Sequence, residues 1–327
     1  MLTGGLIRAL FNDTIPFLNE SRCLNRRNRF EPCNLCEEIC TLRALNINAG
    51  LPVINAKNCD SCGLCASVCP SEALTLRDYK IFRDLAVNDI AKCKNCGGIY
   101  CFKALSPELL AAVILVNPDI NFVMPCDNCE LDKKISGKNL DTALNFLDSF
   151  GILHNITITR DENFENELSR RDLLASFFTL GKNKSSNILE DVFMHTKNDI
   201  FLARKFLIDR LNNFNGEIES GVFYNFTVSE NCNICGLCEG LCPSKSWQIE
   251  KKNGRAQLKF YIENCTGCML CVKKCPVSAI NLREKISWPP ESELKHEINM
   301  TRCRHCGMYF IKSKPDQELC ISCAGHK

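Results

Sequence analysis

The alternation of apolar and polar residues predicts short strands in two separate parts of the chain. A strand with one buried face shows this alternation because successive side chains point to opposite sides. Such strands are predicted at 44–47, 52–54, 73–76, 246–249, 258–262 and 279–282. Four of these segments follow a cysteine at the same distance, which indicates a repeated structural unit.

Between these two parts, the apolar segments are longer. Pro107–Val116 is largely apolar and predicts a buried helix, and Asn121–Pro125 predicts a strand. A helical pattern follows over Leu140–Phe150, and a further strand is predicted over Ile152–Thr159. Strands that alternate with helices predict a small α/β unit.

From Phe164 to Phe214 the apolar spacing is helical, with a polar break at 181–187. In one interpretation these helices pack on each other and on the α/β unit. In the other they form an arm that binds a partner protein. The first interpretation needs no further assumption.

Cysteine is the residue that composition singles out. The chain has 327 residues, of which 25 are cysteine. No basic segment with a long apolar core begins the chain, and the longest apolar run, Leu109–Val116, is too short to cross a bilayer. We therefore expect a cytoplasmic protein without membrane insertion, whose thiols bind metal because that compartment keeps them reduced.

The cysteines form a recurring motif, CxxCxxCxxxCP. Regular copies lie at Cys59–Pro70, Cys232–Pro243 and Cys265–Pro276. Three cysteines at intervals of three residues can converge on one iron–sulfur cubane, and the proline turns the fourth toward a neighbouring cluster. A fourth copy is looser: nine residues separate Cys23 from the run Cys33–Cys40, and threonine replaces the proline.

These motifs resemble those of bacterial two-cluster ferredoxins, and the looser copy resembles ferredoxin-type subunits of the NapF family. The resemblance implies four [4Fe-4S] clusters, each with three ligands from one motif and the fourth from its neighbour. The implied ligand sets are Cys23, Cys33, Cys36 and Cys69; Cys59, Cys62, Cys65 and Cys40; Cys232, Cys235, Cys238 and Cys275; and Cys265, Cys268, Cys271 and Cys242. For Cys23 the alternative is a free buried thiol beside a three-ligand cluster.

Five further cysteines lie in the middle of the chain, at Cys93, Cys96, Cys101, Cys126 and Cys129. Paired CxxC steps predict a zinc or iron–sulfur site formed by all of these except Cys101, which is a spare or alternative ligand. Alternatively, Cys126 and Cys129 form a redox-active dithiol. Core cysteines without a ligand are the third interpretation.

The C-terminal tail carries two cysteine knuckles of the zinc-ribbon type, Cys303–Cys306 and Cys320–Cys323. A segment this short cannot build a large core, so we expect a structural metal to hold it together. Four thiolates predict zinc, with iron as the alternative. A closed set of four ligands leaves no place for a substrate, so the predicted role is structural or partner-binding.

The formal net charge of +2 does not indicate nucleic-acid binding. Each oxidised cluster with four thiolates carries about −2, so four would bring the loaded protein to about −6.

Together these features predict an α+β protein in which two ferredoxin-like dicluster modules flank a small α/β and helical insert, with a zinc-ribbon-like tail. The predicted boundaries are a lead-in 1–22, module one 23–82, the α/β unit 83–160, a helical segment 161–227, module two 228–286, a linker 287–297 and the tail 298–327.

The predicted function is electron transfer. A string of clusters can relay single electrons between a donor and an acceptor protein, here a larger oxidoreductase and its partner. No catalytic triad, paired carboxylates, P-loop or dinucleotide motif is recognisable, which favours a non-catalytic subunit over an enzyme. The alternatives are an accessory protein that assembles an iron–sulfur or molybdenum enzyme, and a dithiol enzyme that uses Cys126 and Cys129.

Overall fold

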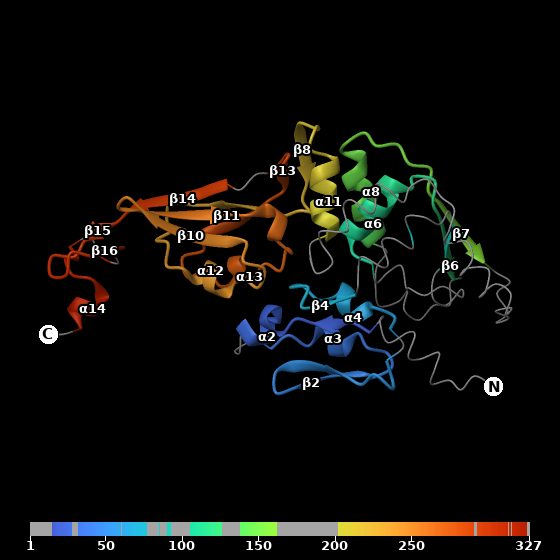
Figure 1. Ribbon diagram of the computed structural model, residues 1–327, viewed down its shortest axis with the longest axis horizontal. Coiled ribbons are helices and arrows are strands. Elements are labelled where there is room, and N and C mark those ends of the chain that lie inside the picture. The colour runs from blue at the N-terminus through green and yellow to red at the C-terminus, as the bar shows by residue number, and fades with distance from the viewer. Residues whose placement is uncertain are drawn as a thin grey trace. The chain divides into compact units, whose positions relative to one another are not determined.

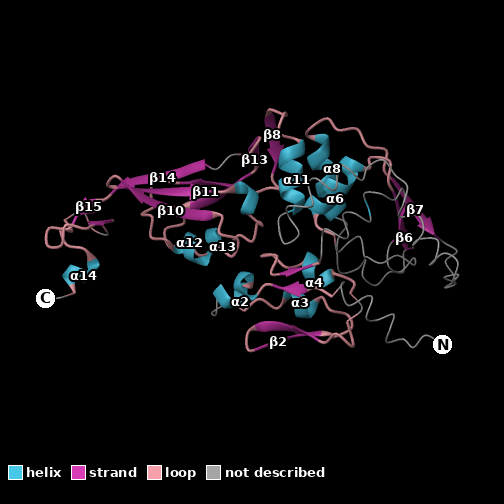
Figure 2. Ribbon diagram, viewed as in Figure 1, coloured by secondary structure: helices cyan, strands magenta, loops and turns pink. Residues whose placement is uncertain are grey.

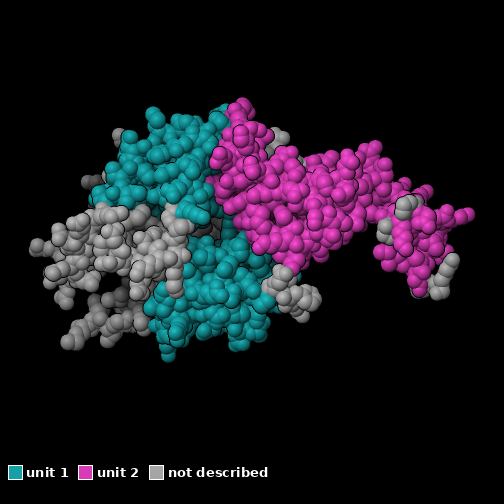
Figure 3. All heavy atoms as spheres, turned by 180° about the vertical axis from the view of Figure 1, so that it is seen from behind, with its two compact units in different colours: residues 1–214 teal, residues 215–327 magenta. Residues whose placement is uncertain are grey.

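The computed structural model divides the chain into two compact units, Met1–Phe214 and Asn215–Lys327 (Figures 1 and 3). The structure describes residues 15–27, 32–59, 61–76, 85, 90–92, 105–125, 138–161, 202–290, 293–312, 314 and 316–325. Within these ranges no helix is both long and apolar enough to cross a membrane.

The first part of unit 1 consists of very short elements around a small apolar core. They are β1 (Phe17–Leu18), η2 (Glu20–Arg22), α2 (Leu24–Arg27), α3 (Leu35–Glu38), β2 (Leu45–Asn48), β3 (Leu51–Ile54), α4 (Leu64–Ser67) and β4 (Leu74–Thr75). β2 pairs with β3 and β1 with β4, both antiparallel. Ala49 and Gly50 join β2 to β3 with φ of +49° and +79°, as a two-residue type I′ turn requires. Buried Cys36, Leu45 and Leu74 form the core.

The second part of unit 1 is a small α/β unit. A parallel sheet has the order β5 (Ile90–Lys92), β6 (Asn121–Pro125), β7 (Thr157–Asp161). The chain also forms α6 (Pro107–Val116) and α8 (Lys138–Asp148), which pack on each other (Figure 2). The predicted helix 107–116 and strand 121–125 are confirmed.

The last strand of this sheet begins later than the sequence predicts, at Thr157 instead of Ile152. The residues before it make a connection, in which Gly151 has a φ of +65° and the Asn155 N–H donates to Pro118 O at 2.9 Å. These backbone bonds leave 152–156 outside the sheet.

Helix α11 (Leu202–Arg210) packs against α6, and Phe214 beyond its end contacts the Phe150 ring with centroids 4.5 Å apart. This agrees with the interpretation that the helical segment packs on the α/β unit, although 162–201 lie outside the described residues.

A buried charge cluster joins the parts of unit 1. Arg204 of α11 is 3% exposed and donates to the carboxylates of Glu72 and Glu108. Arg22 lies 3.5 Å from the second carboxylate oxygen of Glu72. Burial raises the pKa of Glu108, and the Arg204 guanidinium opposes that rise. One arginine therefore connects α11, α6 and the first cysteine-rich part of the chain.

Unit 2 contains a larger sheet and several paired strands. Its elements are β8 (Gly216–Glu219), β9 (Asn225–Val228), α12 (Leu237–Leu241), β10 (Trp247–Lys252), β11 (Arg255–Phe260), η6 (Ile262–Asn264), α13 (Leu270–Lys273), β12 (Ile280–Arg283), β13 (Lys285–Trp288), β14 (Glu293–Asn299), β15 (Thr301–Arg302), β16 (Tyr309–Phe310) and α14 (Ile321–Ala324). The sheet has the order β10-β11-β14, and α12 packs beside β10 (Figure 1). β9 pairs with β12, β8 with β13, and β15 with β16.

The predicted linker 287–297 is wrong, because most of it forms strands. Trp288 ends β13 and is buried against Phe223, with ring centroids 5.1 Å apart. Glu293–Asn299 pairs with β11 along its whole length. The charged composition that suggested a linker suits an edge strand, because charges on an exposed edge prevent pairing with other chains.

We predict that Arg204→Met destabilises unit 1 by about 3–5 kcal/mol, because it leaves the buried Glu108 carboxylate without its cation. Urea unfolding followed by far-UV circular dichroism measures the effect. Lys205→Met, at an exposed position on the same helix, is the control. The combination of Arg204→Met with Glu108→Leu should recover part of the loss, since Glu72 keeps Arg22. Equal stability of Arg204→Met and wild type would refute the structural role of the cluster.

Candidate metal centres

The four cysteine motifs share one loop geometry at their last cysteine. In each, the sulfur accepts a hydrogen bond at 3.2 Å from the backbone N–H four residues later; these pairs are Cys40 with Ala44, Cys69 with Ala73, Cys242 with Ser246 and Cys275 with Ala279. The residue before each donor has a φ between 48° and 57°; these residues are Arg43, Glu72, Lys245 and Ser278. Positive φ is uncommon outside glycine, so its recurrence at one position marks a repeated loop that aims an N–H at a sulfur.

The loose first motif places Cys23 where the regular motifs have their first cysteine. Cys23 follows the 3-10 turn η2, as Cys265 follows η6, and each N–H bonds to the carbonyl three residues earlier, at 3.1 and 3.0 Å. The buried side chain of Asn25 then holds Cys33, accepting from its N–H at 2.6 Å and donating to its carbonyl at 2.9 Å. This two-bond clamp brings Cys23 and Cys33 together despite the longer spacing.

Group I, which is Cys23, Cys33, Cys36 and Cys69, lines one small cavity that is partly open to solvent. Burial, followed by the negative charges of Cys69 and Cys33, raises the pKa of Cys36 to about 12. All four thiols of this set therefore lie close together.

Group II is Cys40, Cys59, Cys62 and Cys65. Burial first, and then the charges of Cys62 and Cys59, raise the pKa of Cys65 well above its usual value. Cys36 of group I contributes to the same rise. Groups I and II are therefore neighbours, and they meet through the third cysteine of each motif.

Group III is Cys232, Cys235, Cys238 and Cys275, which line a second small cavity that is partly open to solvent. Cys235 is exposed. Burial raises the pKa of Cys238 to about 12, and the charge of Cys271 in group IV adds to the rise. Groups III and IV therefore meet in the same way as groups I and II.

Group IV is Cys242, Cys265, Cys268 and Cys271. Cys265 is 8% exposed, and the ring of Tyr224 lies so close to Gly267 that a Cβ there would come within 2.4 Å of it. Only glycine fits this position, whose φ is +68°. Burial raises the pKa of Cys271 to about 12, and the neighbouring Trp247 side chain opposes that rise.

The chemistry of these groups fits a [4Fe-4S] cluster in each. Four crowded thiols cannot ionise together without a compensating positive charge, and burial with neighbouring charges raises the pKa of the third cysteine of each motif. Bound iron would supply that charge, and its binding would displace the thiol protons. Each group has three cysteines from one motif and a fourth from the neighbouring motif, as a ferredoxin site does.

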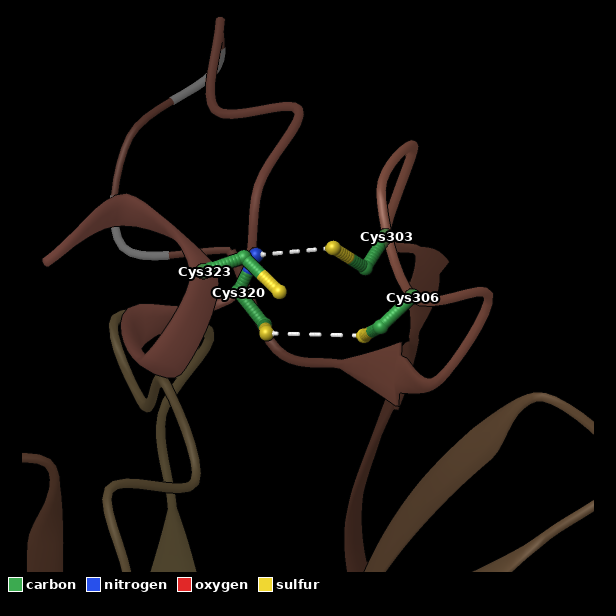
Figure 4. A group of neighbouring side chains, drawn as sticks. All are labelled: Cys303, Cys306, Cys320 and Cys323. Carbon is green, nitrogen blue, oxygen red and sulfur yellow. Dashed lines mark hydrogen bonds between the residues drawn. The ribbon is translucent and has the colours of Figure 1, made fainter. Parts of the chain in front are cut away.

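A fifth group, Cys303, Cys306, Cys320 and Cys323, lies in the C-terminal tail, with all four sulfurs within 4.8 Å of one another (Figure 4). The sulfurs of Cys306 and Cys320 are 3.8 Å apart. Tetrahedral metal–sulfur bonds of about 2.3 Å require sulfurs about 3.8 Å apart. The group can therefore hold a metal ion.

Backbone geometry prepares this group for an ion. The N–H groups of Cys306 and Cys320 lower the pKa of Cys303 to about 6, so its sulfur is ionised at neutral pH. Gly307, with a φ of +74°, turns the first knuckle. Cys303 is the one buried residue among the described residues of 300–325, so the tail has almost no apolar core of its own.

The predicted site in the middle of the chain, at Cys93, Cys96, Cys101, Cys126 and Cys129, lies outside the described residues. It stays a prediction, as does the alternative dithiol.

Sequence reasoning missed three supporting side chains. Glu37 and Glu239 accept from the N–H groups of Ile47 and Ile249, at 3.1 and 2.9 Å, and so connect the ligand helices to the strands. Their common position three residues before a cysteine is a signal that the repeat offered. The Asn25 clamp has no counterpart in the other motifs, so no repeat could reveal it.

Comparison with known proteins agrees with this geometry. Residues 226–282 match the family model of the 4Fe-4S dicluster domain, and residues 52–75 match that of the 4Fe-4S binding domain. An uncharacterised ferredoxin of Methanocaldococcus jannaschii is 35% identical over 43 residues, which are 13% of this chain and 28% of that ferredoxin. No solved structure matches significantly.

These matches define an iron–sulfur protein of ferredoxin type. Two segments of the chain therefore resemble 4Fe-4S ferredoxin domains, and such domains indicate iron–sulfur electron transfer.

We predict that Cys306→Ser removes the metal of the tail and opens its hairpin, because the tail lacks a core that could hold it without an ion. Metal analysis, together with hydrogen exchange of 301–310, measures both effects. Ser322→Ala, at an exposed position in the other knuckle, should change neither. Full protection of the hairpin in Cys306→Ser would show that the tail folds without metal.

Proposed function

We propose that the protein is a polyferredoxin that relays single electrons through four [4Fe-4S] clusters to or from a larger oxidoreductase. The observation that carries this proposal is the gathering of sixteen cysteines into groups I to IV, each with the same N–H···S hydrogen bond at its last cysteine. Such bonds stabilise negative charge on the ligand sulfurs and help to set cluster potentials.

The contacts between groups support a relay. The charge of Cys36 contributes to the raised pKa of Cys65, and the charge of Cys271 contributes to the raised pKa of Cys238. Clusters held by groups I and II would therefore be neighbours, and so would those held by groups III and IV. An electron that enters one member of a pair then has a short path to the other.

The remaining assignments complete the proposal. The tail binds one zinc ion through four thiolates, in a closed site that has a structural or partner-binding role. A zinc or iron–sulfur site in the middle unit is a further element of the proposal. The protein works in the cytoplasm, where a reducing environment keeps so many thiols free of disulfides.

We predict that Cys59→Ser loses about one cluster in four and most of the electron flux to the partner, because Cys59 is a ligand of group II. Ser67→Ala, in the adjacent helix α4, is the matched control and should retain both. Iron analysis and turnover in the assay of a partner enzyme, identified by pull-down from anaerobic extract, measure the two effects.

Two outcomes would contradict this proposal. An unchanged cluster count in Cys59→Ser would mean that group II is not a cluster site. Binding restricted to the metal-free form of the partner, without turnover, would indicate the accessory role in assembly instead of electron transfer.

A further inference from the structure

One turn residue of each cysteine motif precedes the N–H that donates to the last sulfur, and it has positive φ in all four motifs. In three motifs this residue is exposed to solvent; these residues are Arg43, Lys245 and Ser278. In the motif that ends at Cys69 it is Glu72, whose side chain is 23% exposed. Only at Glu72 is the side chain of this turn residue mostly covered by the rest of the chain.

Two arginines from distant parts of unit 1 hold the Glu72 carboxylate. Arg204 of helix α11 donates to one of its oxygens, and the Arg22 guanidinium lies 3.5 Å from the other. Both arginines are buried. Arg204 is itself fixed, because it also donates to Glu108 of α6. Charge-assisted contacts therefore anchor the Glu72 side chain at both of its oxygens.

The backbone on both sides of Glu72 is also fixed. The Arg22 Nε donates to Ser71 O at 3.0 Å, and the Asn19 N–H donates to Ala73 O at 2.7 Å. Together with the anchored carboxylate, these bonds hold the Ala73 N–H in the direction of the ligand sulfur that accepts from it.

Group I is the group whose own motif lacks the regular spacing. Nine residues separate its first ligand, Cys23, from Cys33, whereas two residues separate the first two cysteines of each regular motif. A residue with a side chain is strained at positive φ, and the anchored carboxylate of Glu72 keeps the turn from relaxing that strain. Contacts from outside the motif therefore offset the looseness of this group.

We propose that Arg204 is a positioning residue for the metal site of group I. It acts through Glu72, which it holds in the turn that directs the Ala73 N–H at Cys69, the ligand that the neighbouring motif supplies. Helix α11 has no cysteine, so it contributes to the site through this ion pair. The inference rests on the proposed function, because it requires a cluster at group I.

The Ala73 N–H favours the reduced state of a cluster at group I. One-electron reduction adds negative charge that the ligand sulfurs share, and a donor N–H stabilises that charge. Loss of the Arg204 contact frees the turn and weakens this hydrogen bond. Both the retention of iron at group I and the reduction potential of its cluster should therefore fall.

The test compares the anaerobically purified full chain with the double variant Arg204→Met and Glu108→Leu, which releases Glu72 without leaving an unpaired carboxylate on α6. We expect about a quarter of the iron to pass to a ferrous chelator about fivefold faster than in the wild type, as the strain at one left-handed residue predicts. In a dithionite titration followed by electron paramagnetic resonance, one reduction wave should move to more negative potential. The expected fall in its equilibrium constant is about threefold, or about 28 mV for one electron. Lys205→Met, at an exposed position on the same helix, should change neither result.

A third substitution separates positioning from general stability. Glycine adopts positive φ without strain, so Glu72→Gly added to the double variant should return the release rate and the wave toward the wild-type values. A role of Arg204 in stability alone predicts further loss, because Glu72→Gly also removes the remaining contact with Arg22.

A single substitution tests the same turn in a chain that keeps Arg204 paired with Glu108, and it decides the question if the double variant does not fold. Glu72→Ala keeps the strained turn and removes its anchor, so a quarter of the iron should again leave faster. Lys245→Ala, at the equivalent exposed position of another motif, is the matched control and should release iron at the wild-type rate.

Wild-type release and potentials in the double variant, or in Glu72→Ala where the double variant does not fold, would overturn the positioning role and leave the proposed function intact. Faster loss of iron from both groups I and II, without rescue by Glu72→Gly, would also overturn it, because Arg204 would then only stabilise unit 1. A wild-type protein without reducible clusters would refute the proposed function itself.

Discussion

Repulsion among crowded thiols is the constraint on which the rest of this structure depends. In each of groups I to IV, burial and the charge of neighbouring thiolates raise the pKa of the third cysteine of a motif, as Cys36 and Cys238 illustrate. Such a group is unfavourable as free thiolates, and it becomes favourable when a metal supplies positive charge. The loops that hold the sulfurs are suited to metal ligands. Each loop directs a backbone N–H at the sulfur of the last cysteine of its motif.

The elements around these groups are too small to be stable by themselves. The helices that carry the cysteines have four or five residues. The described strands in the first part of unit 1 form two-stranded sheets. Isolated helices of that length are marginal in water, and so are two-stranded ribbons. Stability must therefore come from the bound metal, from small apolar cores and, in unit 1, from the Arg204 charge cluster. A protein built in this way couples its folding to metal loading.

Features that recur in several cysteine motifs could be predicted from the sequence, whereas contacts that occur only once could not. Cysteine spacing and the alternating tails recur, so they indicated the four groups and the strands beside them. Asn25 acts through contacts that only folding creates, and residues 293–297 looked like a linker because an edge strand is charged. Arg204 meets Glu72 from 132 residues away, a pairing that no local pattern reveals.

The central claim is that four groups of thiols each hold a cubane cluster. Iron and acid-labile sulfide analysis of the anaerobically purified full-length protein tests it most directly, because the count depends on no partner and no variant. The account predicts about sixteen iron and sixteen sulfide per chain from groups I to IV, with more of both only if the middle unit also holds a cluster. About eight of each, in folded protein, would contradict it and leave clusters in only one of the two pairs of groups.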